Sequence, residues 1–183
     1  MIPIKFDVLL LFSGGLDSTV LFKLALNNKL NLRCVLFDYG QQHVVELDYA
    51  RKFCDKFKVQ YDILKLELPI LSNLTEDKHT YEGVSPYHVP ARNLIFLSIA
   101  ASICESRDIP LIWYGANYED RELLFPDCYQ EWVFHLNNVL KINGSIPIKV
   151  EAPLLGMQKQ TIKSLADSFN IYESDILSGY GEK

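Results

Sequence analysis

The sequence lacks several features that would assign it to a special class. It contains no apolar run of about 18 residues, so no transmembrane helix is expected. The apolar stretch near its start is interrupted by Asp7 and is not followed by a small-residue cleavage site, so a core strand is favoured over a signal peptide. Its four cysteines are scattered and include no C-x-x-C pair, which indicates buried thiols. These absences favour a cytoplasmic protein that does not contact a membrane.

An excess of basic residues is also missing. Lysine and arginine number 18 against 23 aspartates and glutamates, which gives a net charge of −5. A dedicated nucleic-acid binder usually has a basic face, so no direct nucleic-acid partner is expected, although a small basic pocket for a nucleotide remains open. The 183 residues, 49% of them apolar, are enough for one domain with a good core, and we expect a single domain over 1–183.

Apolar runs alternate with segments of helical spacing. The runs are short enough for strands buried on both faces, and they lie at 7–12, 33–38, 61–66, 111–114 and 148–151. The helical segments are 18–26, 46–57, 92–104, 127–140 and 159–169. This order predicts an α/β fold with a doubly wound, mainly parallel sheet of about five strands and helices on both faces. The polar, aperiodic segment 69–90 is predicted to be a flexible loop over the site.

A glycine turn separates the first predicted strand from the first predicted helix. It reads Ser13-Gly14-Gly15-Leu16-Asp17-Ser18, contains no lysine, and matches neither the G-x-x-x-x-G-K-[ST] loop nor G-x-G-x-x-G. The glycines permit unusual backbone angles, and Asp17, Ser18 and Thr19 can cap or open the helix. Because ligands bind beyond the carboxyl ends of parallel strands, a phosphate site is one interpretation. A simple tight turn is the other.

Five stretches in order resemble one known family. The pattern S-G-G-x-D-S is similar to the pyrophosphate loop of the PP-loop ATP pyrophosphatases, which split ATP between its α and β phosphates. The later stretches narrow the resemblance to the 7-cyano-7-deazaguanine synthase family: "LFDYGQQH" at 36–43, "VPARN" at 89–93, "YGANYED" at 114–120 followed by "PDCYQEW" at 126–132, and "APLLGMQKQTI" at 152–162. The resemblance covers nearly the whole chain and implies an adenine nucleotide alpha hydrolase-like fold.

The resemblance implies a set of site residues. Those expected to bind ATP are Phe12, Ser13, Gly14, Gly15, Leu16, Asp17, Ser18, Thr19, Phe37, Tyr39, Gly115 and Lys159. Those expected to bind the second substrate are His43, Arg92, Asn93, Asn117, Asp120 and Asp127. The expected catalytic residues are Ser13, Asp17, Ser18, Arg92 and Lys159. Asp17 is expected to hold Mg²⁺, whose charge offsets that of the phosphates.

Several of these residues have a second interpretation from the sequence alone. Arg92 suits a phosphate or carboxylate but can equally be a surface arginine at a helix start. Asp127 can accept from the N–H groups of a guanine-like ring, or can act as a helix N-cap after proline. Lys159 can neutralise pyrophosphate or be a solvated lysine, and His43 can contact a ligand or cap a helix. The Tyr39-Gly40 pair can be a turn without any ligand.

The resemblance also implies an activity. The carboxylate of 7-carboxy-7-deazaguanine is adenylated, ammonia forms the amide, and a second ATP dehydrates it to the nitrile for deazapurine (queuosine or modified DNA) biosynthesis. A homodimer is implied as well. The family carries four C-terminal cysteines that bind zinc, the first in a Ser-Cys-Tyr stretch, but here the sequence reads Ser178-Gly179-Tyr180, so no zinc is expected. An enzyme that stops at the amide, one that transfers the activated group to an amine of a macromolecule, and a non-catalytic nucleotide-binding subunit are the alternatives.

Overall fold

The computed structural model describes residues 5–40, 44–68, 89–122, 125–172 and 175–176. Its five strands form one parallel sheet in the order β3-β2-β1-β4-β5. The strands are β1 (Val8–Leu11), β2 (Leu32–Asp38), β3 (Gln60–Lys65), β4 (Leu111–Trp113) and β5 (Lys149–Glu151). This confirms the predicted α/β class and the positions of all five strands to within about two residues, the usual margin for element boundaries.

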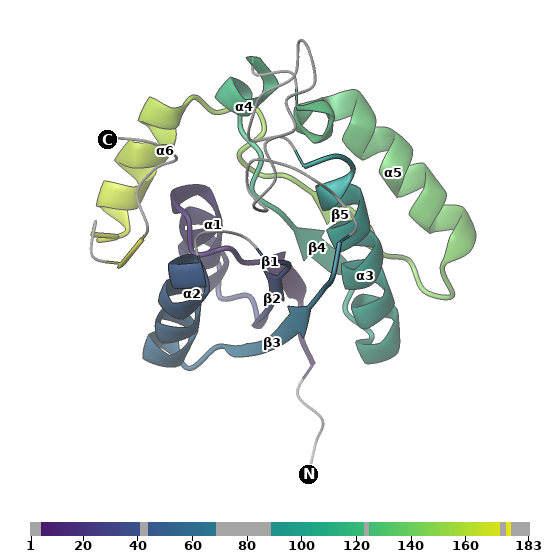
Figure 1. Ribbon diagram of the computed structural model, residues 1–183, viewed down its shortest axis with the longest axis horizontal. Helices are drawn as coiled ribbons and strands as arrows, with labels where there is room; N and C mark the ends of the chain where they lie inside the picture. The colour runs from purple at the N-terminus through teal and green to yellow at the C-terminus, as the bar shows by residue number, and fades with distance from the viewer. Residues whose placement is uncertain (1–4, 41–43, 69–88, 123–124, 173–174, 177–183) are drawn as a thin grey trace.

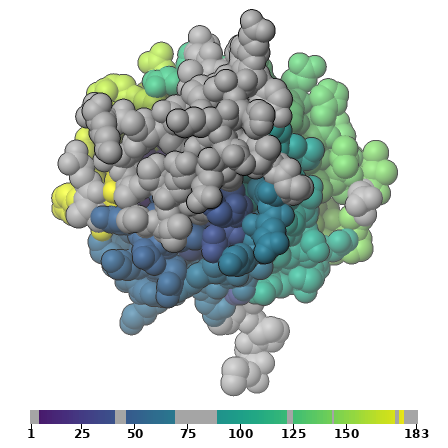
Figure 2. Space-filling model, in the orientation of Figure 1, coloured from purple at the N-terminus to yellow at the C-terminus, as the bar shows by residue number. Residues whose placement is uncertain are grey.

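Helices cover both faces of the sheet (Figure 1). On one face lie α1 (Leu16–Asn27), α2 (Val44–Phe57) and α6 (Lys159–Ser168), and on the other lie α3 (Arg92–Arg107) and α5 (Gln130–Asn143). The short helix α4 (Tyr118–Glu122) and a 3₁₀ turn at Pro126–Cys128 follow β4. In the space-filling view α2, in blue, and α5, in green, lie on opposite flanks (Figure 2). The molecule is therefore a three-layer sandwich.

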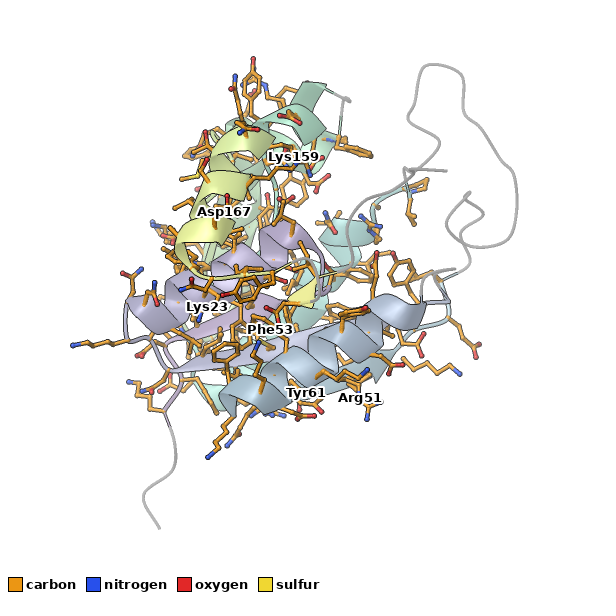
Figure 3. The ribbon with its side chains drawn as sticks, turned by 90° about the vertical axis from the view of Figure 1, so that its left-hand side faces the viewer. Lys23, Arg51, Phe53, Tyr61, Lys159 and Asp167 are labelled. Atoms are coloured by element: carbon orange, nitrogen blue, oxygen red, sulfur yellow. The ribbon has the colours of Figure 1, made fainter. Side chains whose placement is uncertain are left out.

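Each face of the sheet has its own apolar core. Under α1 and α2 an aromatic cluster forms, in which the rings of Phe22 and Phe53 meet edge to face at 5.0 Å. Figure 3 shows Phe53 between these two helices. Under α3 and α5 the core includes Leu97 and Ile112, both without exposed surface. Burying side chains of this size contributes about 1.5–3 kcal/mol each, so the two cores hold the helices against the sheet.

Two sequence predictions about the elements were wrong in detail. The strand β3 was expected to be buried on both faces, but it lies at the sheet edge and Ile63 is 45% exposed. The helix expected over 127–140 is divided into the 3₁₀ turn and α5, because Tyr129 has extended backbone angles. The four cysteines are buried and free, as predicted.

Candidate functional site

The strand order reverses beside β1. The chain runs from β1 to β2 and β3 on one side, and then returns to β4 and β5 on the other side. Ligands of such sheets bind where the order reverses, beyond the carboxyl ends of the strands. Here these are the ends of β1 and β4, paired through Leu9 and Ile112, so the Ser13–Ser18 loop faces the segment that follows β4.

The first helix begins at the glycine loop without a side-chain cap. Gly15 is the N-cap, and the hydroxyls of Ser18 and Thr19 donate back to its carbonyl oxygen at 3.0 and 2.9 Å. Asp17, Ser18 and Thr19, which were expected to cap or open the helix, therefore lie in its first turn, and none of them is the N-cap. Ser13 Oγ lies 3.1 Å from Ser18 Oγ. Because helix geometry supplies no acceptor for the first N–H groups of α1, this end of the helix is suited to an anion.

The two glycines of the loop have different roles. Gly14 has φ +84°, and a Cβ there would lie 2.7 Å from the carbonyl oxygen of Glu46 on α2. Gly15 has φ −77°, and a Cβ at that position would meet only Ser13 Oγ at 3.5 Å. Only Gly14 therefore uses the conformational freedom of glycine, and it does so to let α2 approach the loop.

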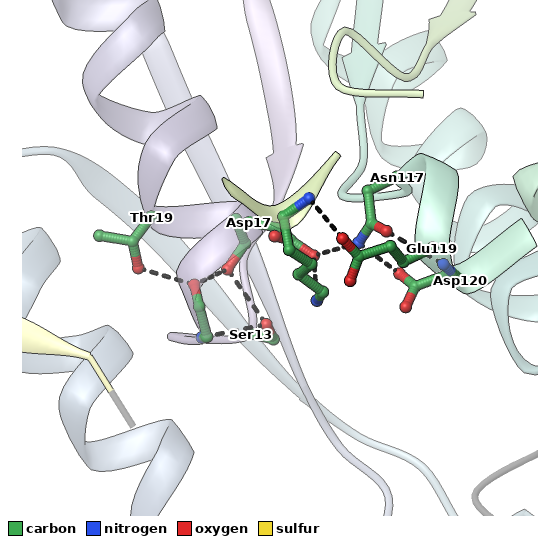
Figure 4. A network of polar contacts seen from close by, with 9 residues as sticks. Ser13, Asp17, Thr19, Asn117, Glu119 and Asp120 are labelled. Atoms are coloured by element: carbon green, nitrogen blue, oxygen red, sulfur yellow. Dashed lines mark hydrogen bonds and ion pairs between the residues drawn. The ribbon is translucent and has the colours of Figure 1, made fainter. Parts of the chain in front are cut away.

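Asp17 lies at the centre of a polar network (Figure 4). Its Oδ2 accepts from Asn117 Nδ2 at 2.8 Å and pairs with Lys159 Nζ at 3.4 Å. Its Oδ1 is buried and has no hydrogen-bond partner among the described residues. A carboxylate oxygen left in this state suits a hard cation such as Mg²⁺, which often takes one or two carboxylates plus substrate phosphates. Within the described ranges there is no cluster of three or more His, Cys, Asp or Glu side chains suited to a metal, so Asp17 fits that ion only together with such phosphates.

Asn117 connects Asp17 to a second carboxylate. Its Nδ2 also donates to Asp120 Oδ2 at 2.7 Å, and its Oδ1 accepts the backbone N–H of Asp120 at 3.0 Å. Burial raises the pKa of Asp120, with the charge of Lys159 lowering it and that of Asp17 raising it. Asn117, which was predicted to bind the substrate, has no exposed surface, and its side chain is buried against the two carboxylates.

The start of α6 is attached to α4 by two bonds. Lys159 is the first residue of α6, as predicted, and its backbone N–H donates to Glu119 Oε1 at 2.9 Å. The N–H of Tyr118 donates to the carbonyl of Met157 at 3.0 Å. These bonds place the Lys159 side chain beside Asp17. Sequence reasoning missed Glu119, since a surface acidic residue has no pattern that links it to a helix 40 residues later.

A second group of predicted residues lines a cavity of about 280 Å³ between the start of α3 and the Pro126 turn. In it Asn93 Nδ2 donates to Asp127 Oδ2, and Arg92 and Trp132 also contribute to the wall. The hydroxyl of Tyr114 donates to the backbone carbonyl of Asp127 at 2.6 Å, and burial raises the pKa of Tyr114. The N-cap of α5 is Tyr129, so the interpretation of Asp127 as the cap of that helix was wrong.

Arg92 connects this cavity to the end of β2. Its Nη1 donates to the hydroxyl of Tyr39 at 3.1 Å, and its guanidinium lies over that ring at 5.8 Å. The Phe37 ring stacks on Phe96 of α3 at 4.1 Å, which leaves Phe37 7% exposed. Arg92 is thus half-buried and held in place rather than a free surface arginine. The chain bends at Tyr39, and Gly40 has φ +79°.

The structure therefore brings the predicted residues together in two adjacent groups. The first contains Ser13, Asp17, Ser18, Asn117, Asp120 and Lys159, and the second contains Tyr39, Arg92, Asn93 and Asp127. The groups adjoin, because the N–H of Phe125 donates to the carbonyl of Asp120 at 3.3 Å and the charge of Asp127 also raises the pKa of Asp120. His43 and all but the last two residues of the 69–90 loop lie outside the described residues.

Comparisons with solved structures agree with this architecture. The U34-tRNA thiolase NcsA from Methanococcus maripaludis superposes with a TM-score of 0.62 at 20% identity, over 92% of this chain and 59% of the thiolase. The NH3-dependent NAD synthetase from Campylobacter jejuni gives 0.61 at 17% identity, over 100% of this chain and 72% of the synthetase. At this level of identity the likeness shows the fold alone.

Comparisons with sequences are more specific. The sequence model of the family described as queuosine biosynthesis protein QueC matches residues 7–183. A 7-cyano-7-deazaguanine synthase from Marinobacter nauticus is 33% identical over 85% of this chain and 75% of its own length. The synthase of Picrophilus torridus is 34% identical over 88% of this chain and 73% of its own length. The synthase of Saccharophagus degradans is 33% identical over 93% of this chain and 81% of its own length.

The reversed sheet order, with the Ser13–Ser18 loop beside the point of reversal, defines a protein with the adenine nucleotide alpha hydrolase-like fold. Within that class, the chain belongs to the 7-cyano-7-deazaguanine synthase family. This membership confirms the family predicted from the motifs and makes the chain an ATP-dependent ligase. Over the stretches described, none of the helices combines the length and apolar content needed to cross a bilayer.

Proposed function

We propose that the chain adenylates the carboxylate of 7-carboxy-7-deazaguanine and joins the acyl group to ammonia, giving first the amide and then 7-cyano-7-deazaguanine. The observation that carries this proposal is that two groups of polar residues adjoin beyond the carboxyl ends of the parallel strands. One group has a helix N-terminus, the ammonium group of Lys159 and a carboxylate oxygen without a partner among the described residues. The other has a mostly apolar cavity into whose wall Arg92, Asn93 and Asp127 bring polar groups. Family membership supplies the substrate class.

ATP is proposed to bind at the first group. The amides at the start of α1 and the hydroxyls of Ser13 and Ser18 would hold the departing pyrophosphate, because donors aimed at a developing negative charge lower the barrier. Lys159 would offset part of that charge from the opposite side. Asp17 would hold Mg²⁺ through Oδ1, and the ion would neutralise phosphate oxygens. The aromatic residues Phe37 and Tyr39 at the end of β2 would lie on the base and ribose side.

The deazaguanine acid is proposed to bind at the second group. Asp127 has two carboxylate oxygens, of which Oδ2 accepts from Asn93. A carboxylate fixed in this way is a fitting acceptor for the N–H donors of a guanine-like ring. Arg92, whose guanidinium donates to Tyr39, is a cation at this cavity suited to the substrate carboxylate or a phosphate. The hydrogen bond from Phe125 to Asp120 makes the two groups neighbours.

With ATP at the first group and the deazaguanine acid at the second, the proposed reaction has two rounds. A carboxylate oxygen of the substrate attacks the α-phosphorus of ATP, and the bond to the β-phosphate oxygen breaks to release pyrophosphate. Ammonia then attacks the acyl carbon, loses a proton, and displaces AMP to leave the amide. The amide oxygen then attacks the α-phosphorus of a second ATP and displaces pyrophosphate in the same way. The adenylated oxygen leaves as AMP, the amide nitrogen loses its two protons, and the nitrile remains. The same loop serves both rounds.

The experiment that tests this is pyrophosphate release from Mg-ATP with 7-carboxy-7-deazaguanine and ammonium, with the products resolved by mass. Release accompanied by nitrile supports the complete reaction. Release with amide as the sole product would support the alternative that the enzyme stops halfway. Release that requires a macromolecular amine instead of ammonium would support group transfer. ATP binding without any release of pyrophosphate would support the alternative that the chain is a non-catalytic nucleotide-binding subunit.

Five further expectations stay predictions. They are the single domain over 1–183, the absence of zinc, a homodimer, the lack of direct nucleic-acid binding, and a cytoplasmic location. Metal analysis and light scattering of the purified protein would test the zinc content and the oligomeric state.

A further inference from the structure

Asn117 makes its contacts entirely inside the protein. Its side-chain amide has two N–H donors, and these go to Oδ2 of Asp17 at 2.8 Å and to Oδ2 of Asp120 at 2.7 Å. Its Oδ1 accepts the backbone N–H of Asp120. With no exposed surface and both donors in use, the side chain has nothing left to donate to a substrate.

The segment that carries Asn117 packs directly on the start of α1. A Cβ at Gly115 would lie 3.3 Å from Cβ of Asp17 and 3.5 Å from the backbone nitrogen of Ser18. A side chain at 115 would therefore be tight against Asp17, which would have to shift by a few tenths of an ångström. The segment after β4 and the glycine loop therefore meet at close range, and from there the Asn117 amide reaches Asp17.

The amide is chemically suited to this position. Two like-charged carboxylates repel each other, and a neutral group with two donors can hold both without adding charge. A serine has one donor, and an aspartate has none when ionised. The bond from Asn117, together with Lys159, occupies Oδ2 of Asp17 and leaves Oδ1 as the oxygen without a protein partner among the described residues.

We propose that Asn117 is a positioning residue that holds the Asp17 carboxylate in the orientation required for the magnesium–nucleotide complex. It acts through Asp17 and does not contact the deazaguanine substrate. The inference rests on the proposed function only in taking Mg-ATP as the ligand of the first group. Partners that orient a ligating group in this way affect metal affinity by about tenfold to a hundredfold when they are removed.

The test is the Mg²⁺ dependence of nucleotide binding, measured by calorimetry with α,β-methylene-ATP in wild type and in Asn117→Ser. Asn137→Ser is the matched control. Asn137 likewise uses its amide to join two elements, donating to the carbonyls of Val133 and Val150 at 3.0 and 2.8 Å. It does so between α5 and β5, away from the glycine loop. Thermal unfolding of both variants measures the structural cost of losing a buried amide.

The Mg²⁺ concentration that half-saturates nucleotide binding should rise about tenfold or more in Asn117→Ser and stay at the wild-type value in Asn137→Ser. A loss of thermal stability in both variants with no change in Mg²⁺ dependence would overturn the proposal. If Asn117→Ser does not fold, Asn117→Gln displaces the amide by one methylene, and the same rise is required of it. Wild type that binds the analogue independently of Mg²⁺ also overturns the inference. Magnesium-dependent binding without pyrophosphate release contradicts the proposed reaction alone.

Discussion

The amino group of Lys159 lies 3.4 Å from Oδ2 of Asp17, across 142 residues of sequence. Two hydrogen bonds hold the start of α6 at this place: the N–H of Lys159 donates to Glu119, and the N–H of Tyr118 donates to Met157. The position of the Lys159 ammonium group therefore does not depend on its own side chain alone. A positive charge here would face the phosphates that leave during the reaction. The pair is therefore the first target for substitution.

Lys159→Met should lower kcat by about a hundredfold to a thousandfold while the protein remains folded, because a preorganised charge at a developing anion contributes on this scale. Steady-state pyrophosphate release measures the effect. Lys163→Met, four residues further along α6 and exposed, is the control and should keep wild-type kcat. Equal losses in the two variants would mean that lysines of α6 act only through general charge.

The Asn93–Asp127 pair in the cavity predicts a selective effect on substrate binding. Asp127→Asn should raise KM for 7-carboxy-7-deazaguanine by about tenfold to a hundredfold, since a charged acceptor of ring N–H groups is lost. KM for ATP should change little. Glu131→Gln on α5, whose carboxylate is 86% exposed, serves as the control. A rise in KM for ATP that matches the rise for the deazaguanine acid would contradict the assignment.

The same substitution should have effects of very different size at the two loop glycines. Gly14→Ala places a Cβ 2.7 Å from a backbone oxygen of α2 and forces an alanine to φ +84°, so it should destabilise the fold by at least about 2 kcal/mol. Gly15→Ala meets only ordinary contact and should change the free energy of unfolding far less. Urea unfolding of the pair, without nucleotide, compares them. Similar losses would show that the close approach of α2 is not the cause.

At the opposite end of β2, the Arg33–Asp62 pair predicts a pH dependence. Hydrogen bonds from Arg33 hold the pKa of Asp62 below its usual value, helped by the charges of Arg33 and Arg107, although burial acts in the other direction. Because the folded-state pKa is lower than the unfolded one of about 3.9, the stabilisation is complete above that pH and is lost as pH falls through the folded value.

Asp62→Asn should therefore cost about 1 kcal/mol near pH 7, a modest amount because the carboxylate is 24% exposed. The difference from wild type should shrink as pH falls below about 3.9 and through the lower folded-state pKa, because Asp62 then becomes neutral in the folded wild type. Urea unfolding at the two pH values checks this. Asp48→Asn removes an exposed partner of Arg51 and should have little effect at either pH. A difference for Asp62→Asn that persists in acid would contradict the assignment of the effect to charge.

Much of the fold followed from local patterns. The alternation of apolar runs and helical spacing predicted five parallel strands and most helix positions, since period and burial are properties of neighbouring residues. The resemblance of the glycine loop and later motifs predicted the family. The exposure of β3 was not predictable in this way, because the place of a strand at the edge of a sheet depends on which strands pair.

The site divides in the same manner. The sequence by itself determined which motifs the chain carries, and Asp17, Lys159 and Asp127 were named from the resemblance of those motifs to a known family. Only the tertiary structure decided that Asn117 lies buried between two carboxylates, that Glu119 receives the N–H of Lys159, and that Gly14 is required by α2. The physical reason is that a hydrogen bond or a steric contact between distant segments depends on how whole helices and strands pack. The residues next to each segment in the sequence do not determine that packing.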